Sequence, residues 1–335
     1  MKRELGILLV GLILDFSLLA VGVMFCPSIS GNAILEEGCL FTFAHITDSP
    51  LPRSREINER VFEWLVEESN VSFVVHTGDI VDNALDETAW EDAYYYFQQL
   101  GNRCSWRVLA GNHDAMSWRG VDLANHERYF GNDSTNQHIV VGDKLLFILF
   151  SWNDMEGRIS NERLEWMDSI IQDNSEMFAI VCLHPHLFGL SLLNILGAPN
   201  YDEIWSHIDW HGNVVMTLCG HIHRNWVQIH SSGIHETWSI STEALMNRGY
   251  IRLFDIYQDR IEVYAYSPWT GQTYFSPLDR FTIDLSSHNY DVDGDLWANN
   301  LDYMPTHPLV PNGIFVSLAL AISLIVYWKH KYFNT

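Results

Sequence analysis

The stretch Val108-Leu109-Ala110-Gly111-Asn112-His113-Asp114 decides the fold class of this chain. Its apolar first half predicts a buried strand, and the glycine with the amide, imidazole and carboxylate after it predicts a loop that carries a functional site. Open α/β sheets bind their ligands at such strand ends. Four other apolar runs end in the same kinds of side chain. They are 41–47 before Asp48, 71–78 before Asp79, 178–183 before His184, and 214–220 before His221 and His223.

The side chains at these strand ends are candidate metal ligands. A mixture of carboxylate, amide and imidazole groups suits Zn, Mn or Fe, whereas an all-oxygen set suits Mg or Ca. A carboxylate such as Asp79 can also bridge two ions. The sequence therefore predicts a metal site where the strand ends meet.

The order of these blocks resembles that of the calcineurin-like metallophosphoesterases, and the resemblance covers residues 40–285. The blocks are Asp48, Gly78-Asp79, Gly111-Asn112-His113-Asp114, His184 and Gly220-His221-Ile222-His223. The resemblance implies an α/β fold, namely a four-layer α/β/β/α sandwich of two mixed β-sheets flanked by helices. It also implies hydrolysis of a phosphate mono- or diester by a metal-activated hydroxide at a dinuclear site.

Carried over residue by residue, the resemblance assigns two divalent metal ions, which are Mn, Zn or Fe. One ion is assigned to Asp48, Asp79 and His223. The other is assigned to Asp79, Asn112, His184 and His221. His113 would protonate the leaving oxygen or stabilise the equatorial charge, and Asp114 would orient the His113 ring.

The first block departs from the family pattern, which is usually Asp-x-His. Here the sequence is Asp48-Ser49-Pro50, and proline has no donor atom for a metal. We therefore expect the first metal site to be weaker than the second. Three further histidines near the blocks are interpreted as packing or supporting residues, and His45 and His186 are the alternative sources of a substitute ligand. These histidines are His45, His76 and His186.

The segments between the strands predict a layered α/β domain. Apolar residues recur at helical spacing in 53–70 and in 86–101, and the inward face of the second helix is assigned to Trp90, Ala93, Tyr94, Phe97 and Leu100. Residues 138–150 predict a hairpin and 160–173 a helix. Five short alternating runs between residues 226 and 285 predict a second, mainly antiparallel sheet.

The net charge is −23, from 19 Lys plus Arg against 42 Asp plus Glu. Such a surface repels nucleic acid phosphates, so a nucleic acid partner is not expected. A phosphorylated substrate, whether a small molecule or a lipid, needs positive charge supplied locally, and bound cations are the natural source.

Both ends of the chain are apolar enough to predict membrane segments. Lysine or arginine flanks each segment on the outer side, which places both tails in the cytoplasm and the body outside it. A cleaved signal peptide is the alternative for the first segment. The predicted boundaries are a cytoplasmic tail at 1–4, a transmembrane helix or signal anchor at 5–25, a linker at 26–39, the metallophosphoesterase domain at 40–285, a linker at 286–311, a transmembrane helix at 312–328 and a cytoplasmic tail at 329–335.

Two classes of function remain open from the sequence. The favoured one is a membrane-anchored, metal-dependent phosphohydrolase. The alternative is a degenerate family member that acts as a catalytically weak binding or structural module. The apolar segment 187–196 is either a buried helix or an exposed lip facing the membrane, and the lip would favour a lipid substrate.

Overall fold

The computed structural model describes residues 38–118, 120–131, 135–187, 197–232 and 235–286. Both predicted transmembrane segments, nearly all of both linkers and residues 188–196 lie outside these ranges, so the expectations about them remain predictions. Within the described ranges, the structure contains no helix with the length and apolar character needed to cross a bilayer.

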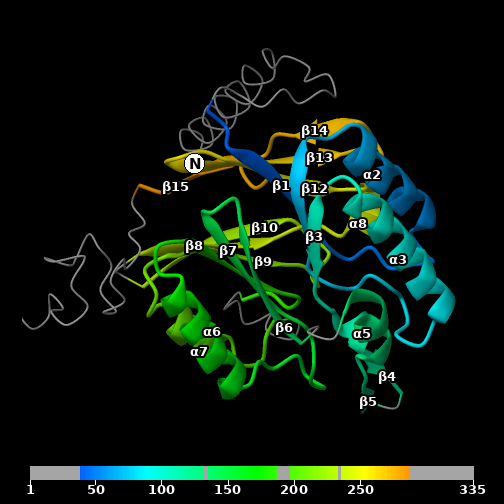
Figure 1. Ribbon diagram of the computed structural model, residues 1–335, viewed down its shortest axis with the longest axis horizontal. Helices are drawn as coiled ribbons and strands as arrows, with labels where there is room; N and C mark the ends of the chain where they lie inside the picture. Colours follow the sequence, from blue (N-terminus) through cyan, green and yellow to red (C-terminus); the bar gives the residue numbers. More distant parts are fainter. Residues whose placement is uncertain (1–37, 119, 132–134, 188–196, 233–234, 287–335) are drawn as a thin grey trace, which may run out of the picture. The chain divides into compact units, whose positions relative to one another are not determined.

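The first of two large sheets carries the amino-terminal strands (Figure 1). Its strands are β1 (Phe41–Ile46), β2 (Val71–His76), β3 (Ser105–Val108), β12 (Ile251–Ile256), β13 (Arg260–Ser267), β14 (Gln272–Tyr274) and β15 (Phe281–Asp284). They are ordered β14-β13-β12-β1-β2-β3, with β15 paired to β13. Strands β1, β2 and β3 are parallel, and β12 is antiparallel to β1, so the sheet is mixed.

The second large sheet is also mixed. Its strands are β6 (Asn136–Val141), β7 (Leu145–Phe150), β8 (Phe178–Leu183), β9 (Val214–Cys219), β10 (Trp226–Ser231) and β11 (Glu236–Ser241). The order is β10-β11-β9-β8-β7-β6, with parallel pairing from β7 to β11 and antiparallel strands at both edges. A small third sheet joins β4 (Met116–Ser117) to β5 (Gly120–Val121).

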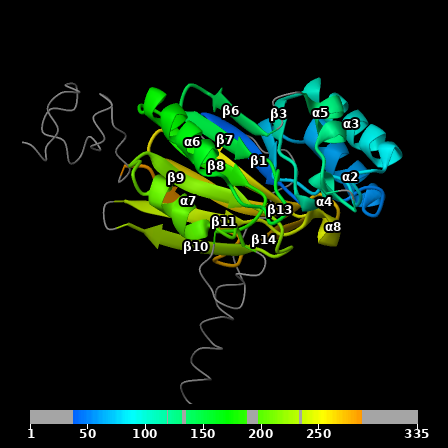
Figure 2. The same ribbon diagram turned by 90° about the horizontal axis from the view of Figure 1, so that it is seen from below.

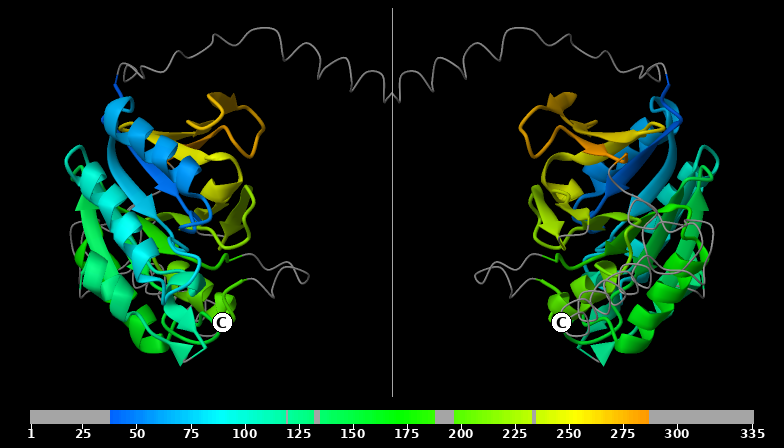
Figure 3. Two further views of the ribbon diagram at one scale, coloured as in Figure 1. Left: turned by 90° about the vertical axis from the view of Figure 1, so that its right-hand side faces the viewer. Right: turned by 90° about the vertical axis from the view of Figure 1, so that its left-hand side faces the viewer.

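The described helices are α2 (Arg55–Glu67), α3 (Glu87–Gly101), α4 (Asn112–Ala115), α5 (Ala124–Phe130), α6 (Asn161–Asp173), α7 (Tyr201–Ile208) and α8 (Leu245–Arg248). Of these, α2 and α3 cover the outer face of the first sheet, and α6 and α7 cover that of the second (Figures 2 and 3). Apolar residues of α2 and α3 pack on the first sheet, and those of α6 and α7 pack on the second. Between the sheets lies a third apolar cluster, in which the rings of Phe43 and Phe147 meet edge-on at 5.1 Å. The predicted fold, two mixed sheets flanked by helices, is confirmed.

Helix α3 shows how local sequence sets an element. Asp86 precedes it and accepts a hydrogen bond from the Ala89 amide at 3.1 Å, which satisfies one of the free donors at the helix start. The predicted inward face is correct except at one position. Tyr94 is 38% exposed at the edge of the apolar stripe, with its ring against Tyr129, and Tyr96 is buried instead.

The prediction of a separate antiparallel sheet after residue 226 is wrong. The later strands divide between the two large sheets, since β10 and β11 extend the second sheet and β12 to β15 extend the first. Alternation in a sequence identifies a strand and its buried face, but it does not identify the neighbouring strand. Here packing decides, because Phe254 of β12 stacks on Phe43 of β1 with a ring separation of 4.3 Å.

Candidate metal centre

The predicted ligands come from the carboxyl ends of parallel strands in both sheets. The first sheet supplies Asp48 after β1, Asp79 after β2 and Asn112 after β3. The second sheet supplies His184 after β8, and His221 and His223 after β9. Main-chain hydrogen bonds join these ends, with the Asp48 amide donating to the Gly78 carbonyl at 3.0 Å and the Gly220 amide donating to the His184 carbonyl at 3.1 Å.

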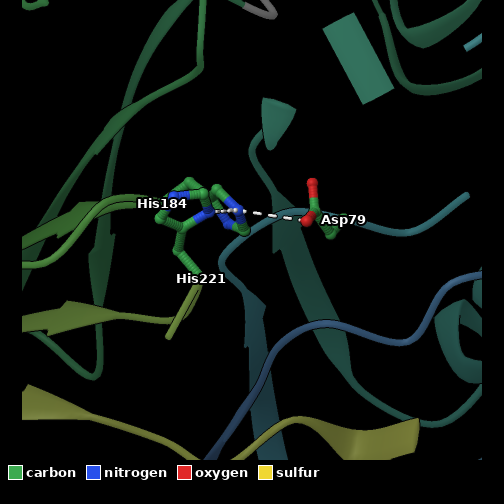
Figure 4. Close-up of side chains that lie close together, drawn as sticks. All are labelled: Asp79, His184 and His221. Atoms are coloured by element: carbon green, nitrogen blue, oxygen red, sulfur yellow. Dashed lines mark hydrogen bonds and ion pairs between the residues drawn. The ribbon is translucent and has the colours of Figure 1, made fainter. Parts of the chain in front are cut away.

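The side chains form two groups that share one carboxylate. Ligand atoms of Asp79, His184 and His221 lie within 4.8 Å of one another, and so do those of Asp48, Asp79 and His223. Figure 4 shows the rings of His184 and His221 facing the Asp79 carboxylate. Asn112 belongs with the first of these groups, because its Oδ1 lies 3.1 Å from His184 Nε2. The structure thus brings all six predicted ligands together in the two expected sets.

His184 marks the place in the first group where a cation fits. Its Nδ1 donates to the Thr77 carbonyl at 2.7 Å, which directs Nε2 toward the other ligands. Lone-pair atoms of Asn112, His221 and Asp79 lie 3.1 to 3.2 Å from that nitrogen. Burial lowers the pKa of His184, but the charge of Asp79 and a hydrogen bond to it raise the pKa to about 9. A positive charge at this point is what the arrangement favours, and a divalent ion would supply it.

Asp79 and His221 respond to the same surroundings. Burial raises the pKa of the Asp79 carboxyl, but the charge of His184 and a hydrogen bond with it lower that pKa to about 2. The pKa of His221 falls to about 4, first because the ring is buried and then because His184 lies beside it. An ionised carboxylate next to a neutral imidazole is the protonation state that metal ligands need.

Asp48 anchors the second group. It is fully buried, and its Oδ2 accepts hydrogen bonds from Thr47 Oγ1 at 2.8 Å and from the His221 amide at 3.0 Å. Its Oδ1 faces His223 Nε2 at 3.1 Å, and this interaction raises the pKa of His223. The carboxylate is therefore held from behind, with one oxygen directed at the other ligands.

Four of the six ligands have a positive φ angle, a backbone conformation that residues other than glycine rarely adopt. The φ angles are 52° at Asp48, 57° at Asp79, 67° at His221 and 54° at His223. Left-handed backbone costs a non-glycine residue about 1–2 kcal/mol, and such strain collects at functional sites. The turns that these angles make bring the side chains back toward one centre.

Two glycines leave the space into which neighbouring ligands fit. A Cβ on Gly111 would lie 2.2 Å from Asp79 Oδ1, and a Cβ on Gly220 would lie 2.4 Å from Asp48 Oδ2. Both distances are too short for any side chain. The absence of a side chain at each glycine therefore lets the carboxylate of another block occupy that space.

The role predicted for Asp114 is wrong. Asp114 is fully buried, and its oxygens accept hydrogen bonds from the amides of Ile80, Val81 and Gly111 at 2.8 to 2.9 Å. It clamps the loop after β2 to the loop after β3 and does not orient His113. Burial, and then the charge of Asp79, raise the pKa of the Asp114 carboxyl to about 7.

His113 lies at the edge of the site, as expected for a residue that is not a ligand. Its side chain is 45% exposed, and its amide donates to Asp79 Oδ1 at 2.9 Å. Its Nδ1 donates to the Asp82 carbonyl at 3.0 Å, so Asp82 takes the orienting role. Sequence reasoning missed Asp82, although it stands only three residues after Asp79 in the same loop.

The other histidines do not replace the ligand missing at Pro50. Both ring nitrogens of His45 contact threonine hydroxyls, at 2.8 Å to Thr77 and 2.7 Å to Thr242. His76 Nε2 donates to Ser49 Oγ at 2.7 Å, which engages the hydroxyl next to Pro50. His186 is buried and belongs to neither ligand group.

Trp152 is a further part of the site that sequence reasoning missed. Its ring lies 5.6 Å from that of His221 and 6.1 Å from that of His184. It follows β7, a strand of the second sheet that is parallel to β8. The same signal that found the ligands, an apolar run ending in polar residues, is present at Ser151-Trp152-Asn153.

Fold and site together define a class of protein, an α/β/β/α sandwich with two metal-binding groups where the strand ends of its sheets meet. The chain belongs to the calcineurin-like phosphoesterase family, whose model matches residues 41–226. The recognition made from the sequence is confirmed, and the predicted enzyme class is confirmed at the level of the family.

Three known proteins show how far this similarity extends. YvnB of Bacillus subtilis (strain 168) is 26% identical in an alignment of 301 positions that covers 78% of this chain and 23% of that protein. A probable cyclic nucleotide phosphodiesterase of Moraxella catarrhalis (strain BBH18) is 26% identical in an alignment of 171 positions that covers 44% of this chain and 57% of that protein. The chain thus spans less than two thirds of the length of these relatives. A dimetal phosphatase from Danio rerio has the same fold, with a TM-score of 0.56, 15% identity, and coverage of 73% of this chain and 99% of that one.

Proposed function

We propose that this protein hydrolyses a phosphate mono- or diester at a dinuclear metal centre. The observation that carries the proposal is the pair of ligand groups that share Asp79. A shared carboxylate is the usual way in which proteins hold two ions a few ångströms apart. The mixture of oxygen and nitrogen ligands favours Mn, Zn or Fe.

The two ions are assigned by the ligand groups. Asp48, Asp79 and His223 hold one, and Asp79, Asn112, His184 and His221 hold the other. When bound, such ions neutralise phosphoryl oxygens and make hydroxide available near neutral pH. They also supply the positive charge that a phosphorylated substrate needs on a protein with a net charge of −23.

His113 is proposed to transfer a proton to the leaving oxygen. The ring is accessible, and the hydrogen bond from Nδ1 to the Asp82 carbonyl leaves Nε2 available for that transfer. We expect His113→Ala to lower turnover by about 10²- to 10⁴-fold with metal content unchanged. Equal loss of metal would make His113 a ligand.

A phosphodiester is the first substrate class to test, because the Moraxella relative is named a probable cyclic nucleotide phosphodiesterase. The full chain would be screened against aryl phosphate monoesters and diesters with Mn, Zn and Fe. We expect turnover that chelator removes and that Asp79→Asn abolishes. A chain that binds two ions but shows no turnover on any ester with any of these metals would instead be the degenerate binding module.

We further propose that the protein is anchored in a membrane, with both tails cytoplasmic and the catalytic domain extracytoplasmic. The proposal rests on the apolar segments at 5–25 and 312–328 and on their basic flanks. A lipid substrate is then within reach. Protease added to intact cells should cut the domain, and cutting only after lysis would reverse the topology.

A further inference from the structure

A cavity of about 660 Å³ lies along the outer edge of strand β3. β3 is an edge strand of the first sheet, and β6 is an edge strand of the second. The side chain of Gln137 of β6 donates a hydrogen bond to the Val108 carbonyl of β3 at 2.9 Å. The volume is in the range of sites that bind small organic ligands. None of the lining residues is a proposed metal ligand.

Two arginines line this cavity, and neither has a carboxylate partner in the part of the chain that the structure describes. The guanidinium of Arg103 donates to the Ser69 carbonyl at 3.1 Å, and that of Arg107 donates to the Trp106 carbonyl at 2.8 Å. Neither forms an ion pair with any acidic residue that the structure describes. Burial lowers the pKa of Arg107, and no acidic group of the described chain offsets that effect.

The missing partners are notable because carboxylates are abundant in this protein. Acidic residues outnumber basic ones by 42 to 19. Arg53, Arg55 and Arg60, which lie on or next to α2, each pair with a carboxylate. Because Arg103 and Arg107 have no ion-pair partner among the described residues, they supply local positive charge beside this cavity in a protein of negative net charge.

The cavity also has an aromatic wall and main-chain donors. The rings of Trp106 and Phe130 line it, with centroids 5.8 Å apart, and both are only partly buried. The Leu109 amide faces β2, where it donates to His76. Because main-chain groups alternate along a strand, the amides of Trp106 and Val108 face away from β2, toward the cavity edge.

We propose that this cavity binds a small organic anion, whose phosphate or carboxylate group contacts Arg103 and Arg107 and whose flat or apolar part packs on Trp106 and Phe130. Guanidinium groups bind both kinds of oxyanion through paired hydrogen bonds. The site is separate from the metal centre, and the inference does not depend on the proposed hydrolase activity.

The test measures binding to the metal-free full chain, so that the metal centre cannot hold the anion. Adenosine monophosphate, citrate and inorganic phosphate would each be titrated by calorimetry. We expect adenosine monophosphate or citrate to bind with a stoichiometry of one, and more tightly than inorganic phosphate. Arg103→Gln and Arg107→Gln should each weaken that binding by about 10- to 100-fold, the scale of a lost charged hydrogen bond.

Arg158→Gln is the matched control, because Arg158 is 46% exposed, pairs with Glu203 at 3.6 Å and lies outside the cavity. It should leave binding unchanged. Phenylglyoxal labelling of the unmutated chain gives the same information without a variant, since the bound probe should protect Arg103 and Arg107 but not Arg158. Mass mapping of the labelled peptides reads out the protection.

The outcomes separate the possible ligands and can overturn the proposal. Binding of adenosine monophosphate without citrate identifies a phosphate site, and the reverse identifies a carboxylate site. Absence of binding with all three probes overturns the proposal. So does binding that persists in both arginine variants, or labelling of Arg103 and Arg107 that no probe reduces.

Discussion

Replacing Gly220 with alanine tests whether the ligand carboxylate of Asp48 needs the space that this glycine leaves open. The added Cβ would lie 2.4 Å from Asp48 Oδ2 and 2.0 Å from Thr47 Oγ1. Real Cβ contacts do not fall below 3.0 Å, so Oδ2 must retreat by about 0.6 Å, and Thr47 Oγ1 by more. The two oxygens belong to one rigid carboxylate, so Oδ1, which faces the other ligands, is displaced along with Oδ2, and metal–ligand distances tolerate a change of only about 0.2 Å. The shift also disturbs the hydrogen bonds from Thr47 and His221 that hold this carboxylate.

We expect Gly220→Ala to weaken the metal site formed by Asp48, Asp79 and His223 by about 10- to 100-fold. Overpacking should also lower the free energy of unfolding by about 1 to 3 kcal/mol. Calorimetric titration of metal and urea denaturation measure the two effects. Gly271→Ala is the control, because Gly271 has a φ of 68° but open space around its Cβ position, so the variant carries backbone strain without a steric clash. Gly220→Ala that binds two ions as tightly as Gly271→Ala would refute the reasoning.

Three further changes test other parts of the structure. Pro50→His should tighten the metal site of Asp48, Asp79 and His223 by about 10- to 100-fold, so that two unequal steps in a metal titration converge. Two equal tight steps in the unmutated chain would show that this site already has a full set of ligands. Asp114→Ala should lower the free energy of unfolding by about 3 kcal/mol or more in urea, because it leaves three buried amides unpaired, whereas Asp122→Ala, which removes one exposed contact, should change it by less than about 1 kcal/mol. Burial raises the pKa of Asp168, but hydrogen bonds with His211 and His207 bring it below the ordinary value. The stability that this carboxylate contributes is therefore complete at neutral pH and lost as the pH falls through the folded-state pKa. The free energy of unfolding of the unmutated chain should exceed that of Asp168→Asn at neutral pH, and this difference should shrink between about pH 5 and pH 3.

The parts of the fold that the sequence predicts are those set by local chemistry. The hairpin between β6 and β7 turns through residues 142–144, and Gly142 and Asp143 have positive φ angles of 63° and 53°, which are typical of tight hairpin turns. Cys182 and Cys219 lie within apolar runs and are buried, as a small apolar side chain should be. The metal ligands follow from a repeated pattern, because five apolar runs of the sequence each end in carboxylate, amide or imidazole side chains.

The parts that could not be predicted depend on contacts distant in the sequence. The pairing of β12 with β1 is decided by packing between Phe254 and Phe43, which lie far apart in the chain. The role of Asp114 is decided by the position of amides in the loop after β2, 33 and 34 residues earlier in the chain. His45 sits close to the ligands in sequence, but its strand turns it toward two threonines. Proximity in sequence therefore indicates that a residue lies near the site, not what it contacts there.

The metal centre connects the two sheets, because its ligands come from both of them. Each ligand group combines carboxylates from the first sheet with imidazoles from the second, and Asp79 belongs to both. The clamp by Asp114 fixes the loops of the first sheet to one another, and the contact of His184 with the Thr77 carbonyl ties the second sheet to them. Ions bound here would link the sheets as well as position a substrate, and binding energy spent on that link appears as folding stability. This gives a physical reason for the strained backbone of the ligands. The positive φ angles are unfavourable in each turn alone, but they direct ligand side chains from both sheets toward a common centre.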